Sequence, residues 1–260
     1  MSENGQVEAE AGAVDGVAAE PRDTTHAHLA GDVIGRHQHG YHQLLYVSAG
    51  VLAVQTGEAS WVASSARAIW LPAGIWHQHR VHGHSSVHTI GFAAHDVLLD
   101  SVTPVVVAVD ALVRELIIAC SEPDLPPQES RRLRAVLRDR LRRALVEPLT
   151  LPTPTNPLLQ QACSLVTDDL RQPRTATWLA RRIGVSERTL ARLFRTEFGM
   201  TYPQWRTTVR VFHAMVLLAE GATVSETGQG CGWATTSAFI DTFSRTMGQT
   251  PGTYRIGAGG

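Results

Sequence analysis

The 260-residue sequence predicts a two-domain α+β protein: an N-terminal β-barrel of the jelly-roll type followed by helices, and a C-terminal all-α domain with two helix-turn-helix units. Three observations predict this class. Between about residues 32 and 94, runs rich in Val, Ile, Leu, Trp and Tyr alternate with Gly and Ser, which is typical of strands in a small barrel. From about residue 108, apolar residues recur at three- and four-residue steps, which indicates helices. Three prolines between residues 151 and 157 mark a linker, because proline cannot continue a helix.

Charge is unevenly distributed along the chain. Hydrophobic residues make up 43% of the sequence, enough for a substantial core, and a formal charge of −1 argues against a generic polyanion binder. All 23 basic residues are Arg; from Arg174 to Arg255 there are ten Arg and five acids. Eleven of the twelve His lie at or before His95. The C-terminal third is therefore basic, and the N-terminal third is rich in potential metal ligands.

The sequence favours a cytoplasmic protein that does not enter a membrane. No apolar run reaches the ~18–20 residues that a membrane span needs, and the acidic start lacks the pattern of a signal peptide. Cys120, Cys163 and Cys231 lie far apart and form no C-x-x-C pair. This spacing argues against a disulfide framework or a zinc finger and fits a reducing compartment.

A helical segment is expected between the β-rich part and the prolines. In SRRLRAVLRDRLRRALVEPL the apolar residues recur at helical spacing, with Arg between them. They are Leu133, Val136, Leu137, Leu141, Ala144 and Leu145. This face is interpreted either as packing on the chain's own β domain or as a pairing surface for a second subunit, because a coiled seam has the same spacing.

The C-terminal part contains a helix-turn-helix pattern at residues 178–201. Gly184 suits a tight turn that needs a positive φ, and Ser186 is placed to cap the next helix. One face of that helix is apolar: Leu190, Leu193, Phe194 and Phe198. Arg188, Arg192 and Arg195 lie off this stripe, so the second helix would present basic side chains.

The same pattern recurs at residues 223–250. Gly232 would form the turn, Thr235 or Thr236 the cap, and Gly248 the end of the helix, whose apolar residues are Phe239, Phe243 and Met247. Residues 203–219 between the two units are expected to form one helix of roughly 26 Å. A rod of this length would set two recognition helices near one DNA turn apart, ~34 Å.

Residues 179–255 closely resemble the AraC/XylS family of transcription regulators. The resemblance rests on LA…GVS…TL-x-R-x-F…GMT, W-R…R, LLAEG, GW…SAF-x-x-x-F and G-x-TP-x-x-YR. It implies that both recognition helices enter the major groove of double-stranded promoter DNA. The residues implied to bind DNA are Arg188, Thr189, Ala191, Arg192 and Arg195 in the first helix, and Thr236, Ser237, Ile240 and Asp241 in the second.

The two units are expected to contribute unequally. Arg is the commonest specific reader of bases, whereas Asp241 would repel phosphate, so the first unit should carry most of the specificity. Gly228 stands where the family usually has Ala, and Trp233 where it usually has Tyr or Phe. Because Gly inside a helix costs about 1 kcal/mol relative to Ala, the second unit is expected to be looser.

Three histidines in the N-terminal part suggest a metal site. His37 and His39 would project from the same face of a strand, and a Pro-x-Gly turn precedes His77. The spacings G-x-H-x-H and P-x-G-x-x-H resemble cupins that bind a divalent metal through three His and one Glu. The resemblance implies His37, His39 and His77 as ligands, with Gln43 at the usual Glu position. Imidazole suits Zn, Ni, Co, Cu or Fe.

A metal-free sensing pocket is the alternative, with these histidines as hydrogen-bonded core groups. Five further histidines of this region are interpreted either as auxiliary ligands or as exposed strand and turn residues, and the second interpretation is favoured for each: His42, His79, His82, His84 and His88. With the resemblance extended to about residues 30–256, the expected divisions are a disordered tail (1–28), a cupin-like sensing domain (29–107), a helical dimerisation or packing segment (108–150), a Pro-rich linker (151–157) and a double helix-turn-helix domain (158–256).

The function expected from this organisation is sequence-specific regulation of transcription. The cupin would sense a small molecule or a divalent metal, and the expected partners are promoter DNA, a second copy of the chain and, for an activator, RNA polymerase. The alternative is a cupin metalloenzyme, a dioxygenase or isomerase with a helical appendage. The missing Glu and the long DNA-binding signature argue against an enzyme.

Overall fold

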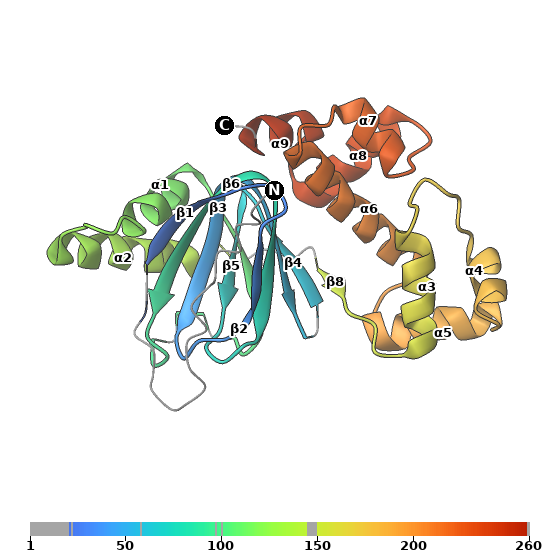
Figure 1. Cartoon of the computed structure of the whole chain (residues 1–260), viewed down its shortest axis with the longest axis horizontal. Coiled ribbons are helices and arrows are strands. Elements are labelled where there is room, and N and C mark those ends of the chain that lie inside the picture. The colour runs from blue at the N-terminus through green and yellow to red at the C-terminus, as the bar shows by residue number, and fades with distance from the viewer. Residues whose placement is uncertain are drawn as a thin grey trace, which may run out of the picture.

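The computed structural model describes residues 21, 23–57, 59–96, 98–99, 101–144 and 150–258. It contains an N-terminal antiparallel β-sheet domain followed by helices and a C-terminal helical domain, as expected. Figure 1 shows helices α1 and α2 on one side of the sheet and the C-terminal helices on the other. The disordered tail expected over residues 1–28 lies outside the described residues except at its end.

The described strands form one eight-stranded sheet in the order β1-β6-β3-β4-β8, with β2 also on β6 and β5 between β3 and β7. Their bounds are β1 (Thr24–His28), β2 (Val33–His37), β3 (His42–Thr56), β4 (Ala59–Ala63), β5 (Arg67–Leu71), β6 (His77–Phe92), β7 (Val105–Ala108) and β8 (Leu151–Pro152). All neighbours pair antiparallel.

The sheet encloses an apolar core of its own. Side chains on β3 alternate between this core and a second apolar cluster. Leu44 and Tyr46 face a cluster that includes residues of α1 and α2. Leu45 and Val47 face a cluster built from β3, β4, β5, β6 and β7 alone. The residues of this latter cluster are buried although all of them lie on strands, which indicates that the sheet curves around them.

Nine helices follow within the described ranges. They are α1 (Ala111–Cys120), α2 (Pro127–Leu141), α3 (Pro157–Thr167), α4 (Ala176–Arg182), α5 (Glu187–Phe198), α6 (Tyr202–Ala219), α7 (Val224–Gly230), α8 (Thr236–Met247) and α9 (Pro251–Ala258). No helix in these ranges is both long enough and apolar enough to cross a lipid bilayer.

Helices α1 and α2 pack on the β domain of their own chain. Ile117 and Leu137 are fully buried in the cluster that contains Tyr46. Their outer side still carries apolar residues, because Leu112 is 43% exposed and Val136 is 45% exposed. The expected packing is therefore observed, and the expected pairing surface is left uncovered in the single chain. Residue 145, also expected on this face, lies outside the described residues.

Two helix-turn-helix units, α4–α5 and α7–α8, share the long helix α6. A hydroxyl at the N-cap accepts a hydrogen bond from a backbone N–H in the first turn of each of these five helices. The capping residues are Thr175, Ser186, Thr201, Thr223 and Thr235. Gly199 and Gly248 end α5 and α8 in the left-handed conformation that glycine adopts without strain.

The second unit is docked on the sheet domain. Val51 and Val62 share a buried cluster with Val211 and Met215 of α6. At the rim, Nη2 of Arg67 donates to the carbonyl of Thr246 at 3.3 Å. The buried cluster connects α6 to β3 and β4, and the hydrogen bond connects α8 to β5. The two domains are therefore in direct contact in addition to being joined by the linker.

The linker joins the sheet to the first unit. Leu151 and Pro152 pair with β4 as strand β8. A few residues later, the carboxylate of Glu197 on α5 accepts hydrogen bonds from the backbone N–H groups of Thr155 and Asn156. The segment expected only as a Pro-rich spacer thus has one end in the sheet and the other on α5.

The end of the expected tail is ordered, which corrects the tail expected through residue 28. Thr24–His28 forms β1 and pairs with β6. The Oγ1 atoms of Thr24 and Thr89 lie 2.7 Å apart, and Asp23 forms an ion pair with Arg134 of α2. These stabilising contacts come from residues far away in the sequence, and TTHAH has no apolar alternation that would indicate a strand.

Candidate metal centre and nucleic-acid interface

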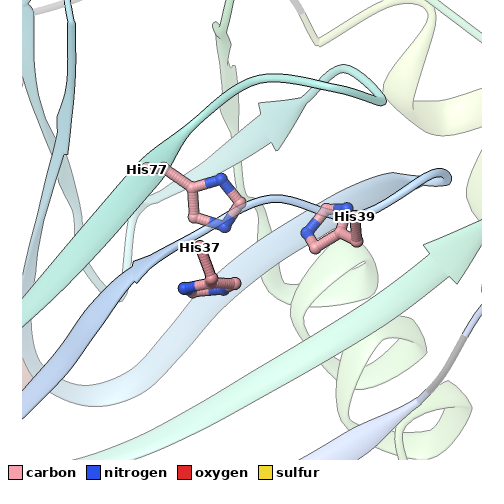
Figure 2. A group of neighbouring side chains, drawn as sticks. All are labelled: His37, His39 and His77. Atoms are coloured by element: carbon pink, nitrogen blue, oxygen red, sulfur yellow. The ribbon is translucent and has the colours of Figure 1, made fainter. Parts of the chain in front are cut away.

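The three histidines expected as ligands come together at the meeting of β2 and β6. His37 ends β2, His39 follows it, and His77 begins β6 directly opposite His37. One nitrogen from each ring can be chosen so that all three lie within 4.8 Å of one another. Figure 2 shows the three rings grouped between these two chain segments.

Backbone carbonyls orient all three rings. Nδ1 of His37 lies 2.8 Å from the carbonyl oxygen of Gly35. Nδ1 of His39 lies 2.7 Å from the carbonyl oxygen of Tyr41, and Nδ1 of His77 lies 2.7 Å from that of Ile75. A carbonyl oxygen only accepts, so each Nδ1 carries the hydrogen and the neutral ring keeps a lone pair on Nε2. Histidines that bind metal ions use this arrangement, with one nitrogen on a fixed acceptor and the other free for the ion.

Burial keeps two of the rings neutral. Burial, together with the neighbouring His37 and His39 rings, lowers the pKa of His77 to about 3. Burial also lowers the pKa of His39. In the part of the chain that the structure describes, the buried Nε2 of His77 has no hydrogen-bond partner. Leaving such a group unpaired costs about 1–3 kcal/mol, a cost that a bound cation would remove. The residues present therefore fit a divalent metal.

Gln43 lies beside the histidines, on β3. It is buried, and its Oε1 is 3.3 Å from Nε2 of His39. A half-turn of the amide exchanges its nitrogen and oxygen, so Gln43 can donate to the free nitrogen of His39 or offer its oxygen to a cation. Unlike the Glu of metal-binding cupins, it brings no negative charge.

Two histidines expected in exposed positions are buried. His79 is on the same face of β6 as His77, and their ring centroids are 5.1 Å apart. Among the described residues, Nε2 of His79 has no hydrogen-bond partner. His88 is buried elsewhere, 2.8 Å from Oγ of Ser48 and 3.0 Å from Oγ of Ser121, and is a hydrogen-bonded core residue. The two-residue spacing of His77 and His79 is the same signal as that of His37 and His39, and it was available in the sequence.

Helix α5 separates an apolar face from a basic one. Leu190, Phe194 and Phe198 are buried in the core of the first unit. The basic residues on the outer side, Arg188, Arg192 and Arg195, are all exposed. Thr189 and Ala191 are half-buried. Within the described residues, none of these three arginines takes part in an ion pair.

Helix α8 presents a different surface. Ser237, Ile240 and Asp241 are exposed, and Thr236 is half-buried. Nη2 of Arg245 donates to Oδ2 of Asp241 at 2.7 Å, one helical turn apart. The charge of Asp241 is therefore balanced within the helix, a pairing that the analysis of the sequence missed although the four-residue spacing indicates it.

Gly228 has a packing reason that the sequence did not reveal. A Cβ at this position would lie 3.2 Å from Cδ1 of Phe239. The Phe239 ring is fully buried, and its centroid lies 4.9 Å from that of the Trp233 ring. The absence of a methyl group at Gly228 and the larger indole at Trp233 are therefore found around the same buried ring.

A curled sheet domain with clustered histidines, joined to two helix-turn-helix units, defines a DNA-binding regulator with a sensing domain. Comparison with known families agrees. Residues 179–256 match a helix-turn-helix domain family and residues 22–105 match the AraC-like ligand binding domain. The chain belongs to the AraC family of helix-turn-helix transcriptional regulators, with an N-terminal AraC-like ligand-binding domain, and is not an enzyme.

Similar proteins include regulators and one DNA complex. The chain is 28% identical over 221 residues to the HTH-type transcriptional regulator NimR of Escherichia coli, covering 84% of this chain and 81% of NimR. It is 34% identical over 110 residues to the HTH-type transcriptional regulator RipA of Corynebacterium glutamicum, covering 41% of this chain and 33% of RipA. The DNA-binding domain of AdpA, solved in complex with a target DNA, is 31% identical, with 39% of this chain and 92% of that chain covered and a TM-score of 0.37.

Proposed function

We propose that this regulator acts in the cytoplasm, senses a divalent metal ion at His37, His39 and His77, and reads a promoter through α5 and α8. The observation that carries the metal assignment is the convergence of three imidazole rings, each fixed by a backbone carbonyl and each bringing one nitrogen within 4.8 Å of the other two. Gln43 would offer a neutral oxygen as a fourth ligand. Bound there, the ion would supply a cross-link between the end of β2 and the start of β6.

Base reading is assigned mainly to the first unit. Arg188, Arg192 and Arg195 are exposed donors without an acidic partner in the described structure, and arginine pairs bidentately with guanine. Thr189 and Ala191 would contact the groove walls beside them. In the second unit, Thr236, Ser237 and Ile240 offer hydroxyl and apolar contacts. The ion pair between Asp241 and Arg245 would weaken base reading there.

Strand β6 offers a route from the sensing site to the DNA-binding domain. His77 begins this strand, and five residues later Nδ1 of His82 lies 3.5 Å from Oε1 of Glu220, next to the end of α6. At the rise of a strand the two histidines are roughly 16 Å apart. Strain on His77 would therefore act on the contact between the domains, and regulation would be a shift between two arrangements of α6 on the sheet.

A second copy of the chain is the proposed partner of the helical segment, since Leu112 and Val136 are exposed on α1 and α2. A symmetric pair would double the number of DNA half-sites that are read together. RNA polymerase is the further partner if the regulator is an activator.

Metal-dependent DNA binding is the test of this function. We expect the affinity of the full chain for duplexes selected from a random pool to change when Zn²⁺, Ni²⁺, Co²⁺, Cu²⁺ or Fe²⁺ is added to metal-free protein. The matched variants are His37→Ala, which should remove the metal effect, and His84→Ala, an exposed histidine on β6 that should keep it. Equal affinity with every metal would contradict metal sensing and favour a small-molecule effector, while failure to select any duplex would contradict sequence-specific binding itself.

A further inference from the structure

The turn of the second helix-turn-helix unit is in contact with the first unit. Gly232 adopts a φ of +78°, and a Cβ there would lie 2.2 Å from the carbonyl oxygen of Leu170 and 2.9 Å from Cα of Arg171. Gly184, the matching glycine of the first unit, has a φ of +73°, and no atom of the described residues lies within 4 Å of the same point. Both turns need glycine for their backbone, but only the second also needs it for a close approach.

One side of α6 carries a row of donors aimed at this region. Tyr202, Arg206 and Arg210 follow one another at four-residue steps, so they lie along the same side of the helix. The hydroxyl of Tyr202 donates to the carbonyl of Arg174, and Nη2 of Arg206 donates to that of Gln172 at 2.6 Å. Both acceptors belong to the loop between α3 and α4 in the first unit.

Arg210 completes the row on the second unit. Its Nη2 donates to the carbonyl of Gly232 at 2.8 Å, and its guanidinium lies 5.4 Å from the ring centroid of Trp233. Leu170 belongs to the core of the first unit, whereas Trp233 packs on the core of the second. The loop of one unit, the shared helix and the turn of the other unit therefore meet at Gly232.

We propose that Arg210 and Gly232 are positioning residues that fix α8 relative to α5, and thereby fix the distance between DNA half-sites that the protein accepts. This inference rests on the proposed reading of DNA by both helices. A rigid link between two binding units raises the affinity for a site of matching spacing by orders of magnitude, and that gain is lost when the geometry is free to vary. All three donors bind backbone carbonyls, so the row depends little on the side chains of the loop it holds.

The competing role for Arg206 and Arg210 is direct contact with DNA phosphates. The two roles differ in salt dependence. Losing an arginine that binds phosphate lowers the slope of log affinity against log salt concentration by about one. Losing an arginine that only positions the helices leaves this slope unchanged and alters the preference for spacing.

The test uses the full chain and duplexes selected from a random pool by the parent protein. From the selected duplex we would prepare a half-site version and a series with one or two base pairs inserted or removed between the half-sites. Arg210→Met keeps the aliphatic stem and removes the donors. Gly232→Ala closes the space beside Leu170, and Gly184→Ala is the matched control with similar backbone strain and no collision.

For Arg210→Met and Gly232→Ala we expect the affinity for the selected duplex to fall roughly 10- to 100-fold, while the affinity for the half-site stays unchanged. Affinity should depend less on the number of base pairs between the half-sites. The slope of log affinity against log salt concentration should stay unchanged. Gly184→Ala should keep the parent's response to spacing. The proposal would be overturned if the affinity of Arg210→Met depended on half-site spacing as the parent's does. A slope of log affinity against log salt concentration reduced by about one would overturn it as well.

A measurement without DNA separates this inference from the proposed function. Spin labels at the exposed positions Thr196 and Ser237, with the three buried cysteines replaced by alanine, report the distance between α5 and α8. We expect a single narrow distance distribution in the parent and a broad one in Arg210→Met. Equal widths would refute the positioning role even if DNA binding behaves as proposed, whereas failure to select a duplex together with the expected broadening would refute only the DNA reading.

Discussion

Replacing His77 with alanine is expected to lower the affinity of the metal-free protein for Zn²⁺ or Co²⁺ by more than about 100-fold. Even partners that only orient a ligand typically contribute roughly 10- to 100-fold, and His77 would supply one of three ligand nitrogens. The measurement is isothermal titration calorimetry, together with the visible absorption of Co²⁺, which reports the number and kind of ligands.

Three further variants make the metal result decisive. His77 is buried, so its loss can disturb folding; His37→Ala, at a half-exposed ring of the same cluster, should show a similar loss. His84→Ala removes an exposed imidazole from the same strand and should bind as the parent does. Gln43→Glu should bind more tightly, because it places a negative charge beside His39. Parental affinity in both His37→Ala and His77→Ala would contradict the metal site.

The second large effect is expected at α5. Arg192→Ala should lower the affinity for the selected duplex by about 10- to 100-fold, the range that the loss of a bidentate base contact produces. Asp241→Ala should change it less, because Asp241 is paired with Arg245 and removing it frees a cation near the DNA. Fluorescence anisotropy with selected and scrambled duplexes, measured side by side, compares the two variants.

A charge control completes this comparison. Arg140→Ala removes an exposed arginine from α2, far from both recognition helices in sequence, and should leave the preference for the selected duplex intact. A greater loss of specificity in Asp241→Ala than in Arg192→Ala would reverse the ranking of the two helices.

The helix-turn-helix units could be predicted in detail because local rules govern them. Gly184 and Gly232 take the positive φ that their turns require, Ser186 caps α5, and the apolar stripe of α5 is buried as its spacing indicates. The histidine pair His37 and His39 was noticed through the two-residue period of a strand, which is local information. The expectation that both lie on the strand was wrong, because β2 ends at His37 and His39 lies just beyond it.

Contacts between distant segments could not be predicted. Strand β1 forms because Thr24–His28 meets β6, and nothing in the five residues themselves indicates a strand. The docking of α6 on Val51 and Val62 depends on the placement of whole domains. The closeness of Gly232 to Leu170 depends on how the two helix-turn-helix units pack on each other within the C-terminal domain. A turn glycine reads the same in the sequence whether its surroundings are open or filled.

The footprint of the full chain on a selected duplex tests the central claim most directly. Helices α5 and α8, joined by α6 and the row of donors along it, should occupy successive major-groove windows on one face of the DNA. Hydroxyl-radical cleavage should therefore show, for each bound chain, two protected stretches whose centres lie about 10–10.5 base pairs apart. A single protected stretch per chain, or two stretches on opposite faces of the duplex, would contradict the account.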